Sequence, residues 1–165
     1  MKSQILFVCT GNTCRSPMAQ GLMNAQIQEQ NLSEQYDVKS AGVAAFAGSP
    51  ASIETRNILL DRGIDFEDFR SSKVTQYLLE ESDYIFCLSR MHREAILSQF
   101  PQFRERALLV GEFLGEEKTK DIADPYGLGD QAYKLVEKQL AVAIENILNF
   151  VQQNSELEDS LEETE

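Results

Sequence analysis

The chain has 165 residues and a mass of 18.6 kDa, which predicts one domain with one core and excludes a large multidomain enzyme. With 42% hydrophobic and 25% charged residues, the composition is that of an ordinary globular protein, neither disordered throughout nor fibrous. A formal charge of −12 at pH 7 would repel a nucleic-acid backbone or an anionic membrane surface. We therefore expect binding to neither nucleic acid nor membranes.

Half of this negative charge lies at the end of the chain. Residues 155–165 contain six acidic side chains and no basic one, which leaves about −6 on the remainder. Such a run is typical of a solvated end, although a specific binding tail is an alternative. We predict a single domain over residues 1–152 and an acidic, disordered tail over residues 153–165.

Cysteine usage and the N-terminal residues favour a reducing compartment. Three cysteines do not make a disulfide framework, and the chain opens on a strand pattern rather than a signal peptide. No stretch approaches the ~20 apolar residues that cross a bilayer. We expect a cytoplasmic protein that is a monomer or a weak dimer.

The apolar pattern predicts alternating strands and helices. Predicted strands cover residues 4–8, 36–41, 84–88 and 107–110; a helix starts at Pro17, and others cover residues 50–61, 90–99 and 131–152. The last helix carries an apolar stripe expected in the core: Leu135, Val136, Leu140, Ile144, Ile147, Leu148 and Val151. Short buried strands between helices predict an α/β fold, a four-stranded parallel sheet with helices on both faces. Ligands of such sheets bind at the carboxyl ends of the strands.

An anion-binding loop follows the first predicted strand. It reads Cys9-Thr10-Gly11-Asn12-Thr13-Cys14-Arg15-Ser16, with five residues between a cysteine and an arginine. A loop of this length can turn its N–H groups inward above a helix N-terminus, forming a cup for a tetrahedral anion. Gly11 and Asn12 best tolerate the left-handed angles of such a turn, and Arg15 can bind two phosphate oxygens. We assign residues 10–16 to phosphate binding.

Cys9 is the candidate nucleophile of this loop. The dipoles that attract phosphate also stabilise a thiolate, and the Ser16 hydroxyl could donate a hydrogen bond to its sulfur. Taken alone, Cys9 would be a buried cysteine at the end of a strand; its setting favours catalysis. A Walker-type loop is excluded because the Gly-Lys-Ser/Thr ending is absent.

Two motifs resemble those of the low-molecular-weight protein tyrosine phosphatases. Val8-Cys9-Thr10-Gly11-Asn12-Thr13-Cys14-Arg15-Ser16-Pro17 is similar to their phosphate-binding loop, and Asp124-Pro125-Tyr126-Gly127 to their general-acid loop. The likeness includes Ser40-Ala41-Gly42 and covers about residues 1–152. It implies a flavodoxin-like or Rossmann-like domain that hydrolyses a phosphorylated protein side chain through a phosphocysteine, without a metal or other cofactor.

The resemblance implies a role for each matching residue. Cys9 attacks phosphorus, Arg15 and the loop amides stabilise the transition state, and Asp124 acts first as general acid and then as general base. Tyr126 lines the pocket. On its own, the Asp-Pro pair would be read as a surface turn.

A supporting network is also implied. Asn12, Ser16 and Ser40 match positions that hold the loop in shape. Some relatives have a histidine where this chain has Phe69, so that arm of the network is missing or rebuilt.

Thr13 bears on the substrate. Tyrosine-specific members usually have Ile or Leu at this position, whereas threonine resembles the bacterial protein arginine phosphatases. A smaller, more polar wall favours a guanidinium over a phenyl ring, so we lean toward phosphoarginine. Phosphotyrosine remains the alternative.

The remaining cysteines and the single histidine give weaker signals. The resemblance suggests a reversible Cys9–Cys14 disulfide, with an inward-packed Cys14 as the alternative. Cys87 lies in an apolar strand and is expected in the core. The thioredoxin-linked arsenate reductases share this fold and anion loop but need two further cysteines on a mobile segment. No second cysteine follows Cys87, so this function is disfavoured. His92 has no metal-ligand cluster around it and is expected to be a surface or partly buried helix residue.

The alternative to an enzyme is a protein module that binds phosphate without catalysing a reaction. Such a module would lack the general acid that Asp124 supplies.

Overall fold

The computed structural model describes residues 1–115 and 121–162, and its centre is a four-stranded sheet. All strand pairs are parallel, in the order β2-β1-β3-β4. The strands are β1 (Ser3–Cys9), β2 (Tyr36–Gly42), β3 (Tyr84–Cys87) and β4 (Ala107–Leu109). The predicted α/β fold with a parallel sheet is confirmed.

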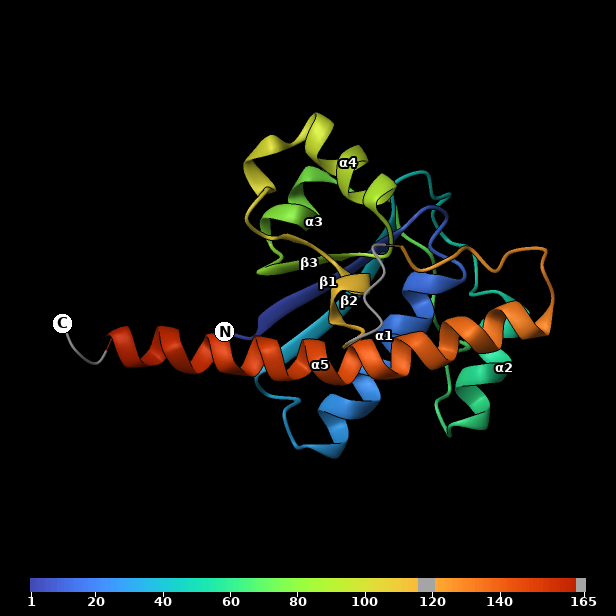
Figure 1. Ribbon diagram of the computed structural model, residues 1–165, viewed down its shortest axis with the longest axis horizontal. Coiled ribbons are helices and arrows are strands. Elements are labelled where there is room, and N and C mark those ends of the chain that lie inside the picture. Colours follow the sequence, from blue (N-terminus) through green and yellow to red (C-terminus); the bar gives the residue numbers. More distant parts are fainter. Residues whose placement is uncertain (116–120, 163–165) are drawn as a thin grey trace.

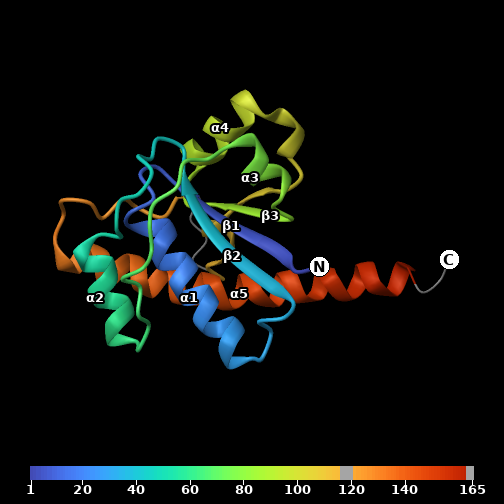
Figure 2. The ribbon, with the colours of Figure 1, turned by 180° about the vertical axis from the view of Figure 1, so that it is seen from behind.

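Helices cover both faces of this sheet (Figures 1 and 2). They are α1 (Arg15–Glu29), α2 (Ile53–Asp61), α3 (Gln76–Glu80), α4 (Arg90–Gln99) and α5 (Asp130–Glu162), with 3-10 turns at Pro101–Phe103 and Val110–Phe113. Helices α1, α2 and α5 lie on one side, and α3 and α4 on the other. The short helix α3 was not predicted, since five residues are too few for a clear helical period.

Strand β1 explains why both faces are covered. Ile5 and Phe7 belong to the apolar cluster shared with α1 and α5, whereas Leu6 and Val8 belong to the cluster shared with α3 and α4. All four side chains are fully buried. A strand that buries both faces in this way forms a rigid platform, and its carboxyl end at Cys9 is fixed in position.

One residue of the apolar stripe predicted on α5, Leu135, does not lie in the core. Val136, Leu140 and Ile144 are buried, but Leu135 is 55% exposed. One residue turns a helix by about 100°, so Leu135 lies outside the arc that faces the core.

The same helix extends beyond its predicted end. We expected a disordered tail from residue 153, but α5 continues to Glu162, and the hydroxyls of Tyr36 and Ser155 lie 3.3 Å apart. The segment has no glycine or proline that would end the helix. Residues 163–165 of the expected tail lie outside the described residues. Among the described helices, none has an apolar stretch long enough to span a membrane.

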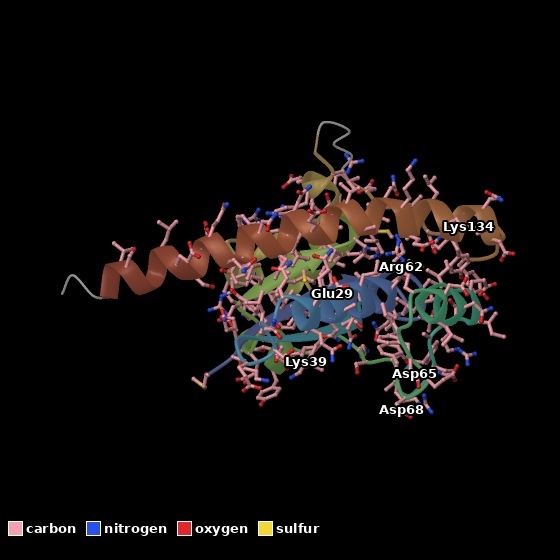
Figure 3. The ribbon with its side chains drawn as sticks, turned by 90° about the horizontal axis from the view of Figure 1, so that it is seen from below. Glu29, Lys39, Arg62, Asp65, Asp68 and Lys134 are labelled. Atoms are coloured by element: carbon pink, nitrogen blue, oxygen red, sulfur yellow. The ribbon has the colours of Figure 1, made fainter. Side chains whose placement is uncertain are left out.

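Figure 3 views the layer of helices made by α1, α2 and α5. Arg62, which follows α2, pairs with Glu137 of α5 at 2.8 Å and ties the two helices together. A groove of about 520 Å³ lies beside Arg62, with Glu29 and Asp65 on its lining. The lining runs from Gly21 near the middle of α1 to Glu29 at its end, so this groove follows the half of that helix farther from the anion-binding loop.

Two leucines of α5 that differ in burial give a direct test of this packing. Leu148 is fully buried and Leu135 is 55% exposed. We expect Leu148→Ala to lower the free energy of unfolding by about 2–5 kcal/mol, because it leaves a cavity. The matched control Leu135→Ala should cost less than about 1 kcal/mol. Urea denaturation of both variants measures the difference, and equal losses would contradict this assignment of the core.

Candidate active site

Two hydrogen-bond donors converge on the sulfur of Cys9. This residue ends β1, and α1 begins six residues later at Arg15. The backbone N–H of Asn12 lies 3.3 Å from Cys9 Sγ, and the hydroxyl of Ser16 lies 2.9 Å from it. Cys9 is 3% exposed. The contact expected between Ser16 and Cys9 is present, and the sulfur is held between a backbone amide and a hydroxyl group.

Asn12 holds the loop in shape. Its φ of 55° lies in the left-handed region, which asparagine tolerates; Gly11, also expected there, does not adopt such an angle. Asn12 Nδ2 donates to Ser16 Oγ at 2.8 Å and to Ser40 Oγ at 2.9 Å. Because Ser16 accepts from Asn12, its own hydroxyl proton is left to donate to the Cys9 sulfur. Ser40 in turn donates to Gln20 Oε1 at 2.6 Å.

The side-chain oxygen of Asn12 also has a hydrogen-bond partner. Its Oδ1 accepts the backbone N–H of Ser72 at 2.8 Å. Phe69, which stands where some relatives have a histidine, stacks on Phe66 with 4.9 Å between ring centroids. A backbone amide, which sequence patterns do not reveal, therefore supplies a donor to the network.

The end of β2 fixes the loop from the side. Cys9 pairs with Gly42 in the sheet register, and the N–H groups of Val43 and Ala44 donate to the carbonyls of Cys9 and Thr10 at 2.9 and 3.0 Å. A Cβ atom at Gly42 would collide with the carbonyl oxygen of Thr10. Only glycine permits this approach.

Arg15 and Asp124 lie next to each other at the loop. Arg15 is 5% exposed, and its guanidinium donates to the carbonyl of Ile122 at 2.9 Å. Its second terminal nitrogen lies 3.8 Å from Asp124 Oδ2. The N–H of Tyr126 donates to Asp124 Oδ1 at 3.1 Å, which orients an otherwise exposed carboxylate. The structure thus places two residues 109 positions apart side by side.

The two expected specificity residues differ in exposure. Thr13 is partly buried, its carbonyl accepts the N–H of Ser52 at 2.8 Å, and its hydroxyl lies 3.7 Å from Cys14 Sγ. Tyr126 is 75% exposed on the segment that carries Asp124.

The other two cysteines are both buried free thiols. Cys87 lies in β3, and burial raises its pKa to about 12, so the predicted core role is confirmed. Cys14 Sγ lies 3.1 Å from the hydroxyl of Tyr133. Burial, followed by this hydrogen bond, raises the pKa of Tyr133, so its phenol stays neutral. The Cys9–Cys14 disulfide remains a prediction.

His92 departs from expectation. We predicted a surface or partly buried residue, but it is fully buried on the first turn of α4. Its Nε2 lies 2.8 Å from Thr10 Oγ1, and its Nδ1 lies 2.9 Å from Ser89 Oγ. Burial, and then the charge of Arg15, lower the pKa of His92 to about 4. Ser89 is the N-cap of α4, three residues before the histidine, and its side chain accepts the backbone N–H of His92. A serine at this position is the sequence feature that could have indicated the Ser89–His92 contact.

A family model matches most of the chain. The family model for the low molecular weight phosphotyrosine protein phosphatase matches residues 4–157. The chain belongs to this family. The low-molecular-weight phosphatase resemblance expected from two short motifs is therefore confirmed.

Individual members of this phosphatase family match nearly the whole chain. It is 33% identical over 152 residues to a protein-arginine-phosphatase of Geobacillus stearothermophilus, covering 92% of this chain and 98% of that protein. A protein-arginine-phosphatase of Bacillus subtilis is 33% identical over 136 residues, covering 82% and 88%. The structure of a low molecular weight protein tyrosine phosphatase from T. tengcongensis superposes with a TM-score of 0.82 at 35% identity, covering 90% and 99%.

Buried, neutral His92 makes stability depend on pH. With an ordinary pKa of 6.5, the unfolded histidine takes up a proton that the folded protein does not bind until about pH 4. We therefore expect the free energy of unfolding to fall as the pH is lowered from about 6.5 to about 4. Urea unfolding of the wild type and of His92→Gln measures this contribution. The decline should be shallower in the variant, and parallel curves would contradict it.

Proposed function

We propose that the protein hydrolyses phosphorylated protein side chains through a phosphocysteine on Cys9, with a preference for phosphoarginine. One observation carries the proposal: the Cys9 sulfur receives two hydrogen-bond donors in a loop whose arginine lies 3.8 Å from a carboxylate. A nucleophile, an oxyanion-stabilising cation and a general acid are thus combined in one site. A phosphate-binding module without turnover would not need Asp124.

In the first step, the Cys9 thiolate attacks phosphorus. The S–P bond forms as the bond from phosphorus to the substrate side chain breaks. Arg15 and the loop amides bind the equatorial oxygens, where negative charge is held in the transition state. Asp124, in its protonated form, gives its proton to the departing oxygen or nitrogen.

In the second step, water releases phosphate. The Asp124 carboxylate takes a proton from a water molecule. The oxygen of that water attacks phosphorus, and the S–P bond breaks. The electron pair of that bond returns to sulfur as a thiolate. Ser16, whose hydroxyl lies 2.9 Å from the sulfur, stabilises the departing thiolate by donating its proton in a hydrogen bond.

Replacing the nucleophile tests the covalent step. We expect Cys9→Ser to abolish turnover of a phosphorylated substrate while inorganic phosphate still binds, because the loop amides and Arg15 remain. Steady-state assays and calorimetric titration with phosphate measure the two properties. Substantial residual phosphatase activity in this variant would refute the phosphocysteine.

Replacing the acid tests the proton transfers. We expect Asp124→Asn to lower kcat by about 10²–10⁴-fold, the usual contribution of a positioned acid or base. The control Asp130→Asn, at the exposed start of α5, should leave kcat unchanged. If the Asp124 variant kept the wild-type rate, the acid role would belong to another residue.

Thr13 and the relatives support phosphoarginine as the substrate. A threonine side chain offers a hydroxyl and little apolar area to a ring, which suits a polar, planar guanidinium better than a phenyl group. Two relatives with 33% identity are protein-arginine-phosphatases. Asp124 would then protonate a guanidinium nitrogen as the P–N bond breaks.

Phosphotyrosine is the second candidate. Tyr126 is 75% exposed beside Asp124 and offers an aromatic surface to a substrate ring. The structural neighbour from T. tengcongensis is named a protein tyrosine phosphatase.

The Thr13 substitution distinguishes the two substrates. We expect Thr13→Ile to raise the ratio of kcat/KM for a phosphotyrosine peptide over a phosphoarginine peptide, because the longer apolar side chain packs a ring. Thr13→Val, which removes the hydroxyl with little change in size, separates polarity from bulk. An unchanged ratio in Thr13→Ile would contradict this specificity role.

We place the enzyme in the cytoplasm. The free thiols of Cys9, Cys14 and Cys87 support a reducing compartment.

A further inference from the structure

A histidine from α4 contacts the phosphate loop next to the nucleophile. Ser16, Ser40 and the backbone of Ser72 all bind Asn12. The side chain of Thr10 instead meets His92, whose Nε2 lies 2.8 Å from Thr10 Oγ1. Helix α4 lies across the sheet from α1 (Figure 1), so the loop is held from both layers of the fold.

We propose that His92 is a positioning residue for catalysis, which fixes Thr10, and through it Cys9 and the loop amides, while Ser89 fixes the imidazole ring. The proposal rests on the phosphatase function proposed above. Thr10 is bonded directly to Cys9, and its carbonyl is already held by the N–H of Ala44 at 3.0 Å. With His92 on its side chain, Thr10 is restrained at two separate points.

The hydrogen bonds around the ring assign its protons. Ser89 Oγ accepts the backbone N–H of His92 at 3.4 Å and lies 2.9 Å from Nδ1. Among the described residues, no further hydrogen bond from the Ser89 hydroxyl is found, so we assign its proton to Nδ1. Nε2 then carries the ring proton and donates it to Thr10 Oγ1. Each ring nitrogen of His92 then takes part in one hydrogen bond, Nδ1 as acceptor from Ser89 and Nε2 as donor to Thr10.

The surroundings keep the hydrogen bonds between Ser89, His92 and Thr10 unchanged across the physiological pH range. Arg15, Asp121 and Asp124 are the charged groups that act on His92, and burial has the largest effect. The pKa of His92 falls to about 4, so the ring stays neutral well below pH 7. A neutral ring adds no second cation beside Arg15 and retains one donor and one acceptor.

The position of the contact also explains why its loss would affect turnover. Asn12 is fixed by three polar partners, whereas the described residues offer the Thr10 hydroxyl a single one, His92. Without it, the segment between Cys9 and Asn12 loses its side-chain restraint on the α4 side. Amides placed less accurately around the transition state should lower kcat more than they weaken binding of the ground state.

A double-mutant cycle tests the proposal with p-nitrophenyl phosphate as substrate. We expect Thr10→Val and His92→Met each to lower kcat by about threefold to tenfold, the equivalent of one neutral hydrogen bond, with a smaller change in KM. The double variant should be no slower than the slower single variant. Thr10→Ser and His92→Gln, which keep hydrogen-bonding groups at these positions, should retain most of the rate.

The controls separate positioning from folding. Ser98→Ala, near the exposed end of α4, should leave kcat unchanged. If His92→Met does not fold, Thr10→Val decides alone, because Thr10 is only partly buried. Wild-type kcat in Thr10→Val, or single effects that multiply in the double variant, would overturn the proposal.

A spectroscopic readout is independent of turnover. The chain contains one histidine, so imidazole ¹H–¹⁵N spectra show a single residue. We expect Thr10→Val to shift the Nε2 signal, and an unchanged signal would contradict the contact with Thr10. If wild-type protein hydrolysed neither the aryl phosphate nor a phosphoarginine peptide, the proposed function would fail, while these spectra would still decide whether His92 contacts the loop.

Discussion

The convergence of hydrogen-bond donors on the Cys9 sulfur is the interaction on which the site depends. A charged sulfur at the end of a buried strand is unfavourable unless donors replace the water it has lost. Asn12 and Ser16 supply them at 3.3 and 2.9 Å. Both are available because Asn12 adopts a left-handed backbone angle and its side chain leaves the Ser16 proton free for sulfur.

The sheet makes this arrangement rigid. Parallel strands bring their carboxyl ends to one edge, so the residues that follow β1, β2 and β3 meet without a long connection. Gly42 at the end of β2 approaches the loop closely, and Ser89 after β3 caps the helix that carries His92. Apolar burial on both faces of β1 fixes Cys9, and polar contacts at the edge then fix the loop around it.

Local patterns predicted part of this site from the sequence. The anion-binding loop lies within one short segment, between a strand that ends at Cys9 and a helix that begins at Arg15. Periodicity and turn chemistry were therefore enough to predict the loop and the elements on either side of it. Asp124 was assigned only through a family motif, because no local rule brings it to Arg15. The contacts of His92 with Thr10 and of the Ser72 amide with Asn12 depend on packing between distant elements. The helical continuation of α5 was missed because its acidic composition outweighed its helix-forming residues in our interpretation.

Selective alkylation of Cys9 tests the central claim most directly. The protein is treated with iodoacetate at neutral pH, with and without inorganic phosphate, and modified cysteines are mapped by mass spectrometry. The account predicts that Cys9 reacts before Cys14 and Cys87, and that phosphate slows its modification by occupying the loop above the sulfur. Faster modification of either other cysteine, or no protection of Cys9 by phosphate, would contradict it.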